Sequence, residues 1–184
     1  MTKYVALLRG INVGGKNPVR MAALKEGFEG IGFVDVATYI QSGNVVFGAG
    51  RPSDAAMTER IERMLTSTFG FDARVVLRSR TQMRSIVERA PDGFGADPAT
   101  YRYDVIFLKP PLTARAAIKS VPTREDVDNA HAANGVLYFS RLTSRASQSR
   151  LSRIVSMPIY RDMTIRNWNT TTKLRELVEA PLGS

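Results

Sequence analysis

Polar residues gather at three places in the chain, each at the end of an apolar run or at a turn. The first run is Arg9–Lys16, directly after the apolar stretch Tyr4–Leu8; the second is Tyr39–Asn44, and the third is Arg166–Lys173. All three are rich in hydrogen-bond donors and contain no Asp, Glu or His. Such residues suit the binding of phosphate or carboxylate oxygens. They suit general-base catalysis poorly, because none of their side chains titrates near neutral pH.

The first run comes close to the phosphate-binding loop of nucleotide hydrolases. Gly10, Gly15 and Lys16 satisfy the pattern G-x-x-x-x-G-K. Asn17 then stands where those enzymes place the Ser or Thr that binds Mg²⁺. Pro18 follows, whereas the hydrolase loop continues directly into a helix. We therefore interpret this run as an anion-binding or backbone-positioning loop and not as part of a nucleotide hydrolase.

Each polar run also has a purely structural interpretation. Asn12, Asn44 and Asn169 are of a type that often stabilises turns or helix ends. The pair Thr170–Thr171 is expected to cap the last helix, whose N-terminus is itself favourable for anions. Trp168 is expected to anchor the core and not to stack on a ligand. These alternatives stay open at the level of sequence.

Composition excludes several classes of function. The 184 residues include no cysteine and one histidine, His131, so disulfides, thiol nucleophiles and cysteine-bound metals are excluded and a zinc site is not expected. No apolar run approaches the roughly 20 residues that cross a bilayer, and the N-terminus becomes charged too soon for a signal peptide. We expect a cytoplasmic protein with no membrane partner, no metal and no cofactor.

The net charge of +9 is concentrated in two segments. Arg74–Arg89 holds five arginines and one acid, and Arg141–Arg175 holds eight basic residues and one acid. Such patches attract phosphates, nucleic acid or acidic partners. The alternative is that they form ordinary solvated surface.

The elements that must position these residues alternate between periods of two and 3.6. In the first half we expect a tight hairpin at Ser42-Gly43 and a helix capped by Ser53 or Asp54 and ended by Gly70. The expected strands are 3–9, 34–41, 44–47 and 73–78, and the expected helices are 21–31, 54–69 and 81–89. The β-α-β-β-α-β order favours a ferredoxin-like sheet.

The second half follows the same plan. A type I′ hairpin is expected at Asn134-Gly135. The expected strands are 103–109, 124–133, 136–140 and 163–166, and the expected helices are 112–121, 147–155 and 171–179. The sequence Met83–Glu88 resembles Leu174–Glu179. We therefore predict an α+β protein of two tandem ferredoxin-like units in a duplicated α/β-sandwich: a first half at 1–90, a linker at 91–100, a second half at 101–180, and a tail at 181–184 for which no packing is predicted.

The segments Leu7–Lys16, Tyr39–Phe47 and Arg166–Lys173 resemble the signatures of the bacterial domain of unknown function 1697. The resemblance implies an α+β fold with no assigned activity. Ile165 departs from the family pattern, which favours Thr before Arg-Asn-Trp-Asn, so one donor is missing. The resemblance implies a shared site made of Arg9, Asn12, Gly14, Gly15, Lys16, Gln41, Ser42, Gly43, Asn44, Arg166, Asn167, Asn169 and Lys173.

These observations favour a protein that binds an anionic, phosphate-bearing small molecule. One alternative is an enzyme in which Arg9, Lys16 and Arg166 stabilise an anionic substrate electrostatically. Others are a nucleic-acid-binding module and a structural module whose motifs fix turns. We expect the Arg9–Lys16 and Arg166–Lys173 loops to line one cleft between the halves, because ligands usually bind in such clefts. Gly14 and Gly15 are expected to adopt positive φ.

Overall fold

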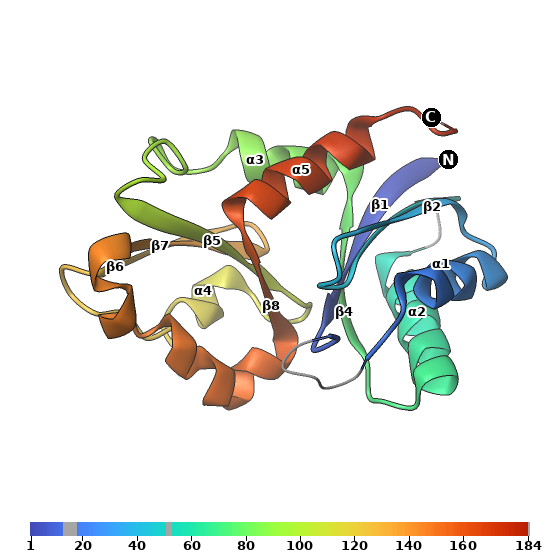
Figure 1. Ribbon diagram of the computed structural model, residues 1–184, viewed down its shortest axis with the longest axis horizontal. Coiled ribbons are helices and arrows are strands. Elements are labelled where there is room, and N and C mark those ends of the chain that lie inside the picture. Colours follow the sequence, from blue (N-terminus) through green and yellow to red (C-terminus); the bar gives the residue numbers. More distant parts are fainter. Residues whose placement is uncertain (13–17, 51–52, 184) are drawn as a thin grey trace. The chain divides into compact units, whose positions relative to one another are not determined.

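The computed structural model describes residues 1–12, 18–50 and 53–183. This part of the chain has a mixed α+β fold with two four-stranded antiparallel sheets and helices (Figure 1). The chain divides into two compact units. Unit 1 combines Met1–Arg84 with Lys173–Ser184, and unit 2 comprises Ser85–Thr172. The chain therefore leaves unit 1 after its fourth strand and returns to it within the last helix.

Unit 1 contains one sheet in the strand order β2-β3-β1-β4. Its elements, in chain order, are β1 (Thr2–Arg9), α1 (Met21–Gly30), β2 (Val34–Tyr39), β3 (Asn44–Ala49), α2 (Asp54–Phe69) and β4 (Arg74–Ser79). Two further helices contribute to it: α3 (Arg80–Glu88), which begins in unit 1, and α5 (Trp168–Glu179), which ends there. Arg84 of α3 forms an ion pair with Glu179 of α5 at 2.7 Å.

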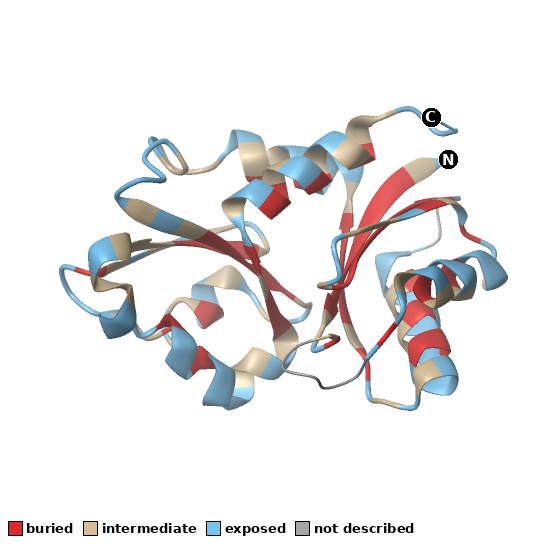
Figure 2. Ribbon diagram, viewed as in Figure 1, coloured by how far each residue is buried: buried red, intermediate tan, exposed pale blue. Residues whose placement is uncertain are grey.

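The helices of unit 1 begin and end where local signals in the sequence place them. The Ser53 hydroxyl accepts a hydrogen bond from the Ala56 amide at 3.2 Å and so caps α2. Gly70 ends this helix in the left-handed conformation, with φ of 74°. The apolar stripe of α2, which includes Met57 and Ile61, is buried with α1 residues in the core on one face of the sheet (Figure 2).

Unit 2 contains the second sheet, in the order β6-β7-β5-β8. Its elements are β5 (Tyr101–Leu108), α4 (Ala114–Ala117), β6 (Asp128–Ala133), β7 (Val136–Leu142), three 3₁₀ segments (Thr143–Gln148, Leu151–Ser156 and Pro158–Asp162) and β8 (Met163–Asn167). The strand order repeats that of unit 1, strand for strand. The amide of Leu108 donates to Gly135 O at 3.0 Å, just as the amide of Leu8 donates to Gly43 O at 2.8 Å.

The 147–155 region differs from its expected helix. It forms parts of two 3₁₀ segments, η1 (Thr143–Gln148) and η2 (Leu151–Ser156), and a third, η3 (Pro158–Asp162), follows. Serines recur throughout this stretch and compete for backbone hydrogen bonds, and Pro158 cannot continue a helix. The helix expected over 112–121 is also shorter: it is limited to Ala114–Ala117 and is capped by Thr113, whose hydroxyl accepts a hydrogen bond from the Ala116 amide.

Two hairpin turns also differ from expectation. At Asn134-Gly135 only Gly135 has positive φ, 75°, so the turn is not type I′, which needs positive φ at both residues. The first hairpin is not a tight turn at Ser42-Gly43. Tyr39 pairs with Asn44, which leaves a four-residue turn, Ile40–Gly43, between the strands.

The C-terminal segment Pro181–Gly183 has contacts that the sequence alone does not predict. Lys3 Nζ donates to Pro181 O at 2.9 Å and forms an ion pair with Asp35 at 2.7 Å. A Cβ on Gly48 would lie 2.8 Å from the Leu182 side chain, so this glycine leaves room for Leu182. The segment therefore packs along β1, β2 and β3.

Candidate ligand-binding site

The loop that follows β1 is closed by the side chain of Asn12. Asn12 Oδ1 accepts a hydrogen bond from the Val19 amide at 2.8 Å, and Asn12 Nδ2 donates to Val19 O at 3.0 Å. These two bonds fix the two ends of the loop next to each other. Three predicted site residues, Gly14, Gly15 and Lys16, lie outside the described residues, so their roles and the φ values of the glycines stay predictions.

Asn12 also connects the first polar run to the second. Its Nδ2 donates to Gln41 O at 2.9 Å, and Leu8 donates to Gly43 O in the same region. Gly43 has φ of 78°, and a Cβ there would lie 2.9 Å from side-chain atoms of Ile11 and Leu8. Only glycine fits this approach of the turn to the loop. The structure therefore brings the first two runs together at one end of the unit 1 sheet.

The turn between β2 and β3 is held from inside by Asn44. This side chain is fully buried, and its Nδ2 donates to Tyr39 O at 3.0 Å and to Ser42 Oγ at 3.2 Å. Asn12 and Asn44 thus serve the structural role that was one of the two interpretations of their sequence. Gln41, in contrast, is exposed. It remains available as a ligand contact.

Positive charge is concentrated at the end of β1. Arg9 lies directly opposite Arg74 on β4, and both are half-buried. Guanidinium groups donate charge-assisted hydrogen bonds to the oxygens of anions. Arg74 was part of a basic segment in the sequence, but nothing there indicated that it faces Arg9.

Among the described residues, each unit contains one buried arginine at a matching place in its sheet. Arg78 lies opposite Val5 and is 5% exposed, and Arg166 lies opposite Val105 and is 8% exposed. Burial lowers the pKa of each guanidinium to about 10, because the charged form loses hydration. Both remain cations at neutral pH. Arg78 was missed as a candidate because it lies in an otherwise ordinary strand pattern.

The guanidinium group of Arg166 is oriented by its own strand. Nη1 donates to Thr164 Oγ1 and to Ile165 O, both at 2.8 Å. The group is buried in unit 2, whereas Arg9 belongs to unit 1. The expectation that their two loops line one cleft stays a prediction.

The rest of the third run forms the start of α5. Asn167 Oδ1 accepts a hydrogen bond from the Thr170 amide at 2.7 Å, so Asn167 is the cap and the helix begins at Trp168. The expected cap at Thr170–Thr171 is wrong, because both threonines lie inside the first turn and are buried. Asn169 is exposed on that turn.

Lys173, the last residue of the third run, belongs to unit 1 and is exposed. Its Nζ lies 2.9 Å from a Glu176 carboxylate oxygen. The pKa of Lys173 is raised mainly by the hydrogen bond to Glu176 and by the negative charge of that carboxylate. Tyr39 adds a smaller electrostatic contribution. The lysine therefore lies within electrostatic reach of the residue that precedes the Ile40–Gly43 turn.

Trp168 packs in an aromatic cluster of unit 2. Its ring meets Phe94 edge-on at 5.1 Å between centroids, and Phe94 also contacts the rings of Tyr103 and Tyr138 at 4.9 and 5.2 Å. Gly95 lies against the indole of Trp168, so that a side chain at position 95 would overlap this ring. Trp168 therefore serves as a packing anchor, as expected.

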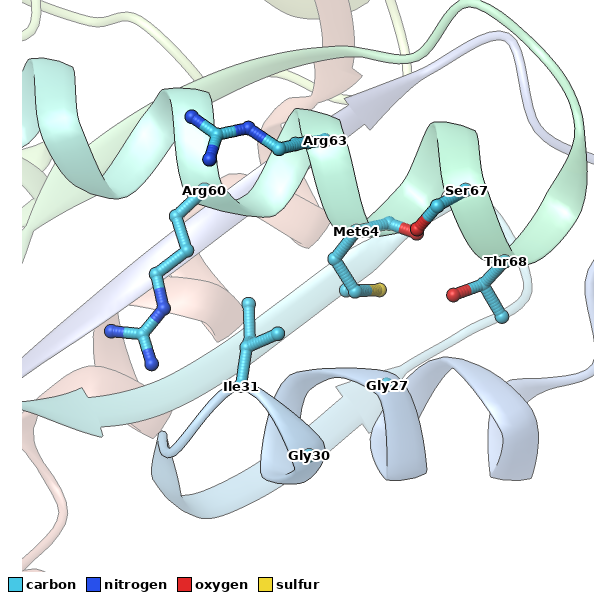
Figure 3. A pocket seen from close by; sticks show the side chains of 8 residues that line it. All are labelled: Gly27, Gly30, Ile31, Arg60, Arg63, Met64, Ser67 and Thr68. Carbon is cyan, nitrogen blue, oxygen red and sulfur yellow. The ribbon is translucent and has the colours of Figure 1, made fainter.

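A groove of about 490 Å³ lies elsewhere on unit 1, between α1 and α2 (Figure 3). A Cβ on Gly27 would lie 2.7 Å from Met64 Sδ, so α1 and α2 approach each other closely at this glycine. Gly27 and Met64 both line the groove. Arg63 is paired with Glu59 at 2.6 Å, and Arg60 lies over the Phe33 ring. The lining contains no predicted site residue: it consists of Gly27, Gly30, Ile31, Arg60, Arg63, Met64, Ser67 and Thr68.

Within residues 1–12, 18–50 and 53–183, no three or more His, Asp or Glu side chains are grouped so that they could hold a metal ion. No helix in the same ranges is both long and apolar enough to cross a membrane.

The family described as "Protein of unknown function (DUF1697)" matches residues 1–138, so the chain belongs to this family. The matched region contains the first two polar runs and ends before the third. A solved structure, of the conserved bacterial protein SP0830 from Streptococcus pneumoniae, is similar over almost the whole chain. The two share 28% sequence identity with a TM-score of 0.83, and the similarity covers 98% of this chain and 99% of that one. No curated protein matches the chain.

Proposed function

We propose that unit 1 binds an anionic, phosphate-bearing small molecule where the loop after β1 meets the Ile40–Gly43 turn. The observation that carries this proposal is the pair Arg9 and Arg74, which face each other at the end of β1. Two neighbouring guanidinium groups can donate charge-assisted hydrogen bonds to the oxygens of one anion. The adjoining loop and turn are rich in donors and contain no carboxylate.

The residues of this site have two different roles in the proposal. Asn12, Gly43 and Asn44 position the backbone. The side chains of the two asparagines bind the backbone of the loop and the turn, and Gly43 allows the close approach of the turn to Ile11 and Leu8. The proposed ligand contacts are Arg9, Gln41, Ser42 and Lys173, together with the Gly14–Lys16 segment. Arg166, Asn167 and Asn169 of the third run belong to unit 2, and they are proposed as ligand contacts of that unit.

We also propose that the two halves of the chain, 1–90 and 101–180, arose by duplication of one ferredoxin-like unit. The repeated strand order, the matching hydrogen bonds at Leu8 and Leu108, and the matching arginines Arg78 and Arg166 support it. Duplication would explain why both units carry a cation at one sheet position.

A thermal-shift experiment tests the binding proposal. Inorganic phosphate, sugar phosphates and nucleotides are screened against the full chain; a ligand at 100 times its Kd adds about 2.7 kcal/mol to the free energy of unfolding. We expect at least one of them to raise the melting temperature. Arg9→Gln should abolish that rise, because it removes one of the two facing cations.

The control variant is Arg63→Gln, which makes the same change of charge on α2. Arg63 is exposed and lies among the groove residues, so this variant should keep the full thermal shift. No shift with any compound, or equal loss in both variants, would contradict the proposed site.

A nucleic-acid-binding function is favoured by a different observation. Arg153 and Arg161 are exposed in the 3₁₀ segments of unit 2, and Arg150 is exposed directly before the second of these segments. Binding through this surface would weaken steeply as salt rises, because phosphate contacts release counterions. A small-molecule site in unit 1 would not depend on these three arginines.

A further inference from the structure

The turn between β2 and β3 holds an isoleucine in a backbone conformation that isoleucine disfavours. Ile40 has φ of 49°, and its residue surface is 50% exposed. In this left-handed region the Cβ comes too close to the following carbonyl oxygen. For a β-branched residue such a conformation is an outlier that indicates strain. The chain therefore keeps an exposed apolar side chain in a strained position.

Two asparagine side chains keep Ile40 in that conformation. Asn44 Nδ2 donates to Tyr39 O at 3.0 Å, and Asn12 Nδ2 donates to Gln41 O at 2.9 Å. The two carbonyls belong to the residues on either side of Ile40. With both fixed, the backbone at Ile40 cannot rotate to a relaxed conformation without losing a hydrogen bond.

Burial of Ile40 offers only partial compensation for this strain. Half of its surface stays in water, so the hydrophobic gain is well below that of a core isoleucine. Asn or Gly would adopt the same conformation at lower cost. Strained backbone conformations are concentrated at ligand-binding sites, where the position of a side chain matters more than the conformational energy of its residue.

The surroundings of Ile40 combine this apolar side chain with polar donors. Gln41 is exposed beside it, and Ser42 follows in the same turn. Lys173 lies within electrostatic reach of Tyr39, the residue before Ile40. A ligand at this turn would meet donors and a cation on one part of its surface and a fixed apolar contact on another.

We propose that Ile40 is a specificity-determining contact, and that the anion bound by unit 1 carries an apolar or aromatic ring that packs against it. This inference rests on the proposed anion site and adds the chemical class of the ligand. The bound molecule is then a phosphate ester of a ring-bearing alcohol, and the ring accounts for part of its affinity.

Phenyl phosphate and inorganic phosphate are suitable probes, titrated calorimetrically into the full chain. The wild type should bind phenyl phosphate more tightly. Ile40→Asn should lower this preference about five- to tenfold, since it removes a half-buried apolar contact. The same variant should raise the melting temperature by about 2–4 °C, because Asn tolerates positive φ.

The matched control is Ile40→Val, which keeps the β-branch and most of the apolar surface. It should leave both the preference and the melting temperature close to wild type. An unchanged preference in Ile40→Asn, or a lower melting temperature, would overturn the inference. Equal binding of both probes by the wild type would overturn the role of Ile40 but not the anion site. Binding of neither probe would overturn both.

Discussion

The side-chain amide of Asn12 makes three hydrogen bonds, two with the backbone of Val19 and one with Gln41 O. It holds the loop after β1 closed and ties it to the β2–β3 turn. Asn12 itself has φ of 52°, which Asn tolerates better than most residues. One side chain therefore holds Asn12 next to Val19 and ties both to the β2–β3 turn.

Asn12→Ala should lower the free energy of unfolding by about 2–3 kcal/mol, because three hydrogen bonds are lost and Ala disfavours positive φ. Urea or thermal denaturation measures this loss. The matched control is Asn169→Ala, an exposed asparagine on α5 whose change should stay within about 0.5 kcal/mol. Equal stability of the two variants would show that Asn12 does not hold the loop.

Among the secondary-structure elements, those with strong local signals were predictable from the sequence. The apolar stripe of α2, its cap at Ser53 and its end at Gly70 follow from residues within or next to the helix. The structure confirms all three. The 3₁₀ segments at 143–162 were not predictable in the same way, since their helical periodicity competes with serines and Pro158. The positions of the first two polar runs were found, and turn stabilisation was one of the two interpretations of Asn12 and Asn44. The partners were not predictable, since Gln41 lies 29 residues from Asn12.

Lys3 of β1 links the edge strand β2 to the C-terminal segment by an ion pair and a hydrogen bond. Lys3 Nζ contacts Asp35 and Pro181 O, and Asp35 also accepts a hydrogen bond from the Gly183 backbone. The hydrogen bond from Lys3 is the main cause that lowers the pKa of Asp35 below its usual value. A carboxyl with a lowered pKa in the folded state stabilises the fold above its unfolded pKa. That contribution is lost as pH falls through the lowered value.

Asp35→Asn should therefore reduce stability at neutral pH and make it less sensitive to pH in the acidic range. Asn is nearly isosteric and tolerates the positive φ of 51° at this position, so the backbone should not change. The measurement is the melting temperature of wild type and variant from neutral pH to about pH 3. The difference between them should shrink as pH falls below about 4; a constant difference would contradict the role of the ion pair.

At the scale of the whole chain, the two units share a strand order but differ in how they are built. Unit 1 takes its last residues, Lys173–Ser184, from the far end of the sequence. Periodicity predicted most elements of both halves, the helix expected at 147–155 excepted, yet it contains no information on which unit the second part of α5 joins. That depends on contacts such as Arg84 with Glu179 and Lys3 with Pro181, which are distant in sequence.

The central claim is that an anion binds where the loop after β1 meets the β2–β3 turn of unit 1. The most direct measurement is an NMR titration of the ¹⁵N-labelled full chain with inorganic phosphate, followed through the backbone amide shifts. We predict that the largest shifts occur at Arg9–Asn12 and Ile40–Asn44, with Thr143–Asp162 unaffected. The absence of shifts, or shifts confined to Thr143–Asp162, would contradict the claim.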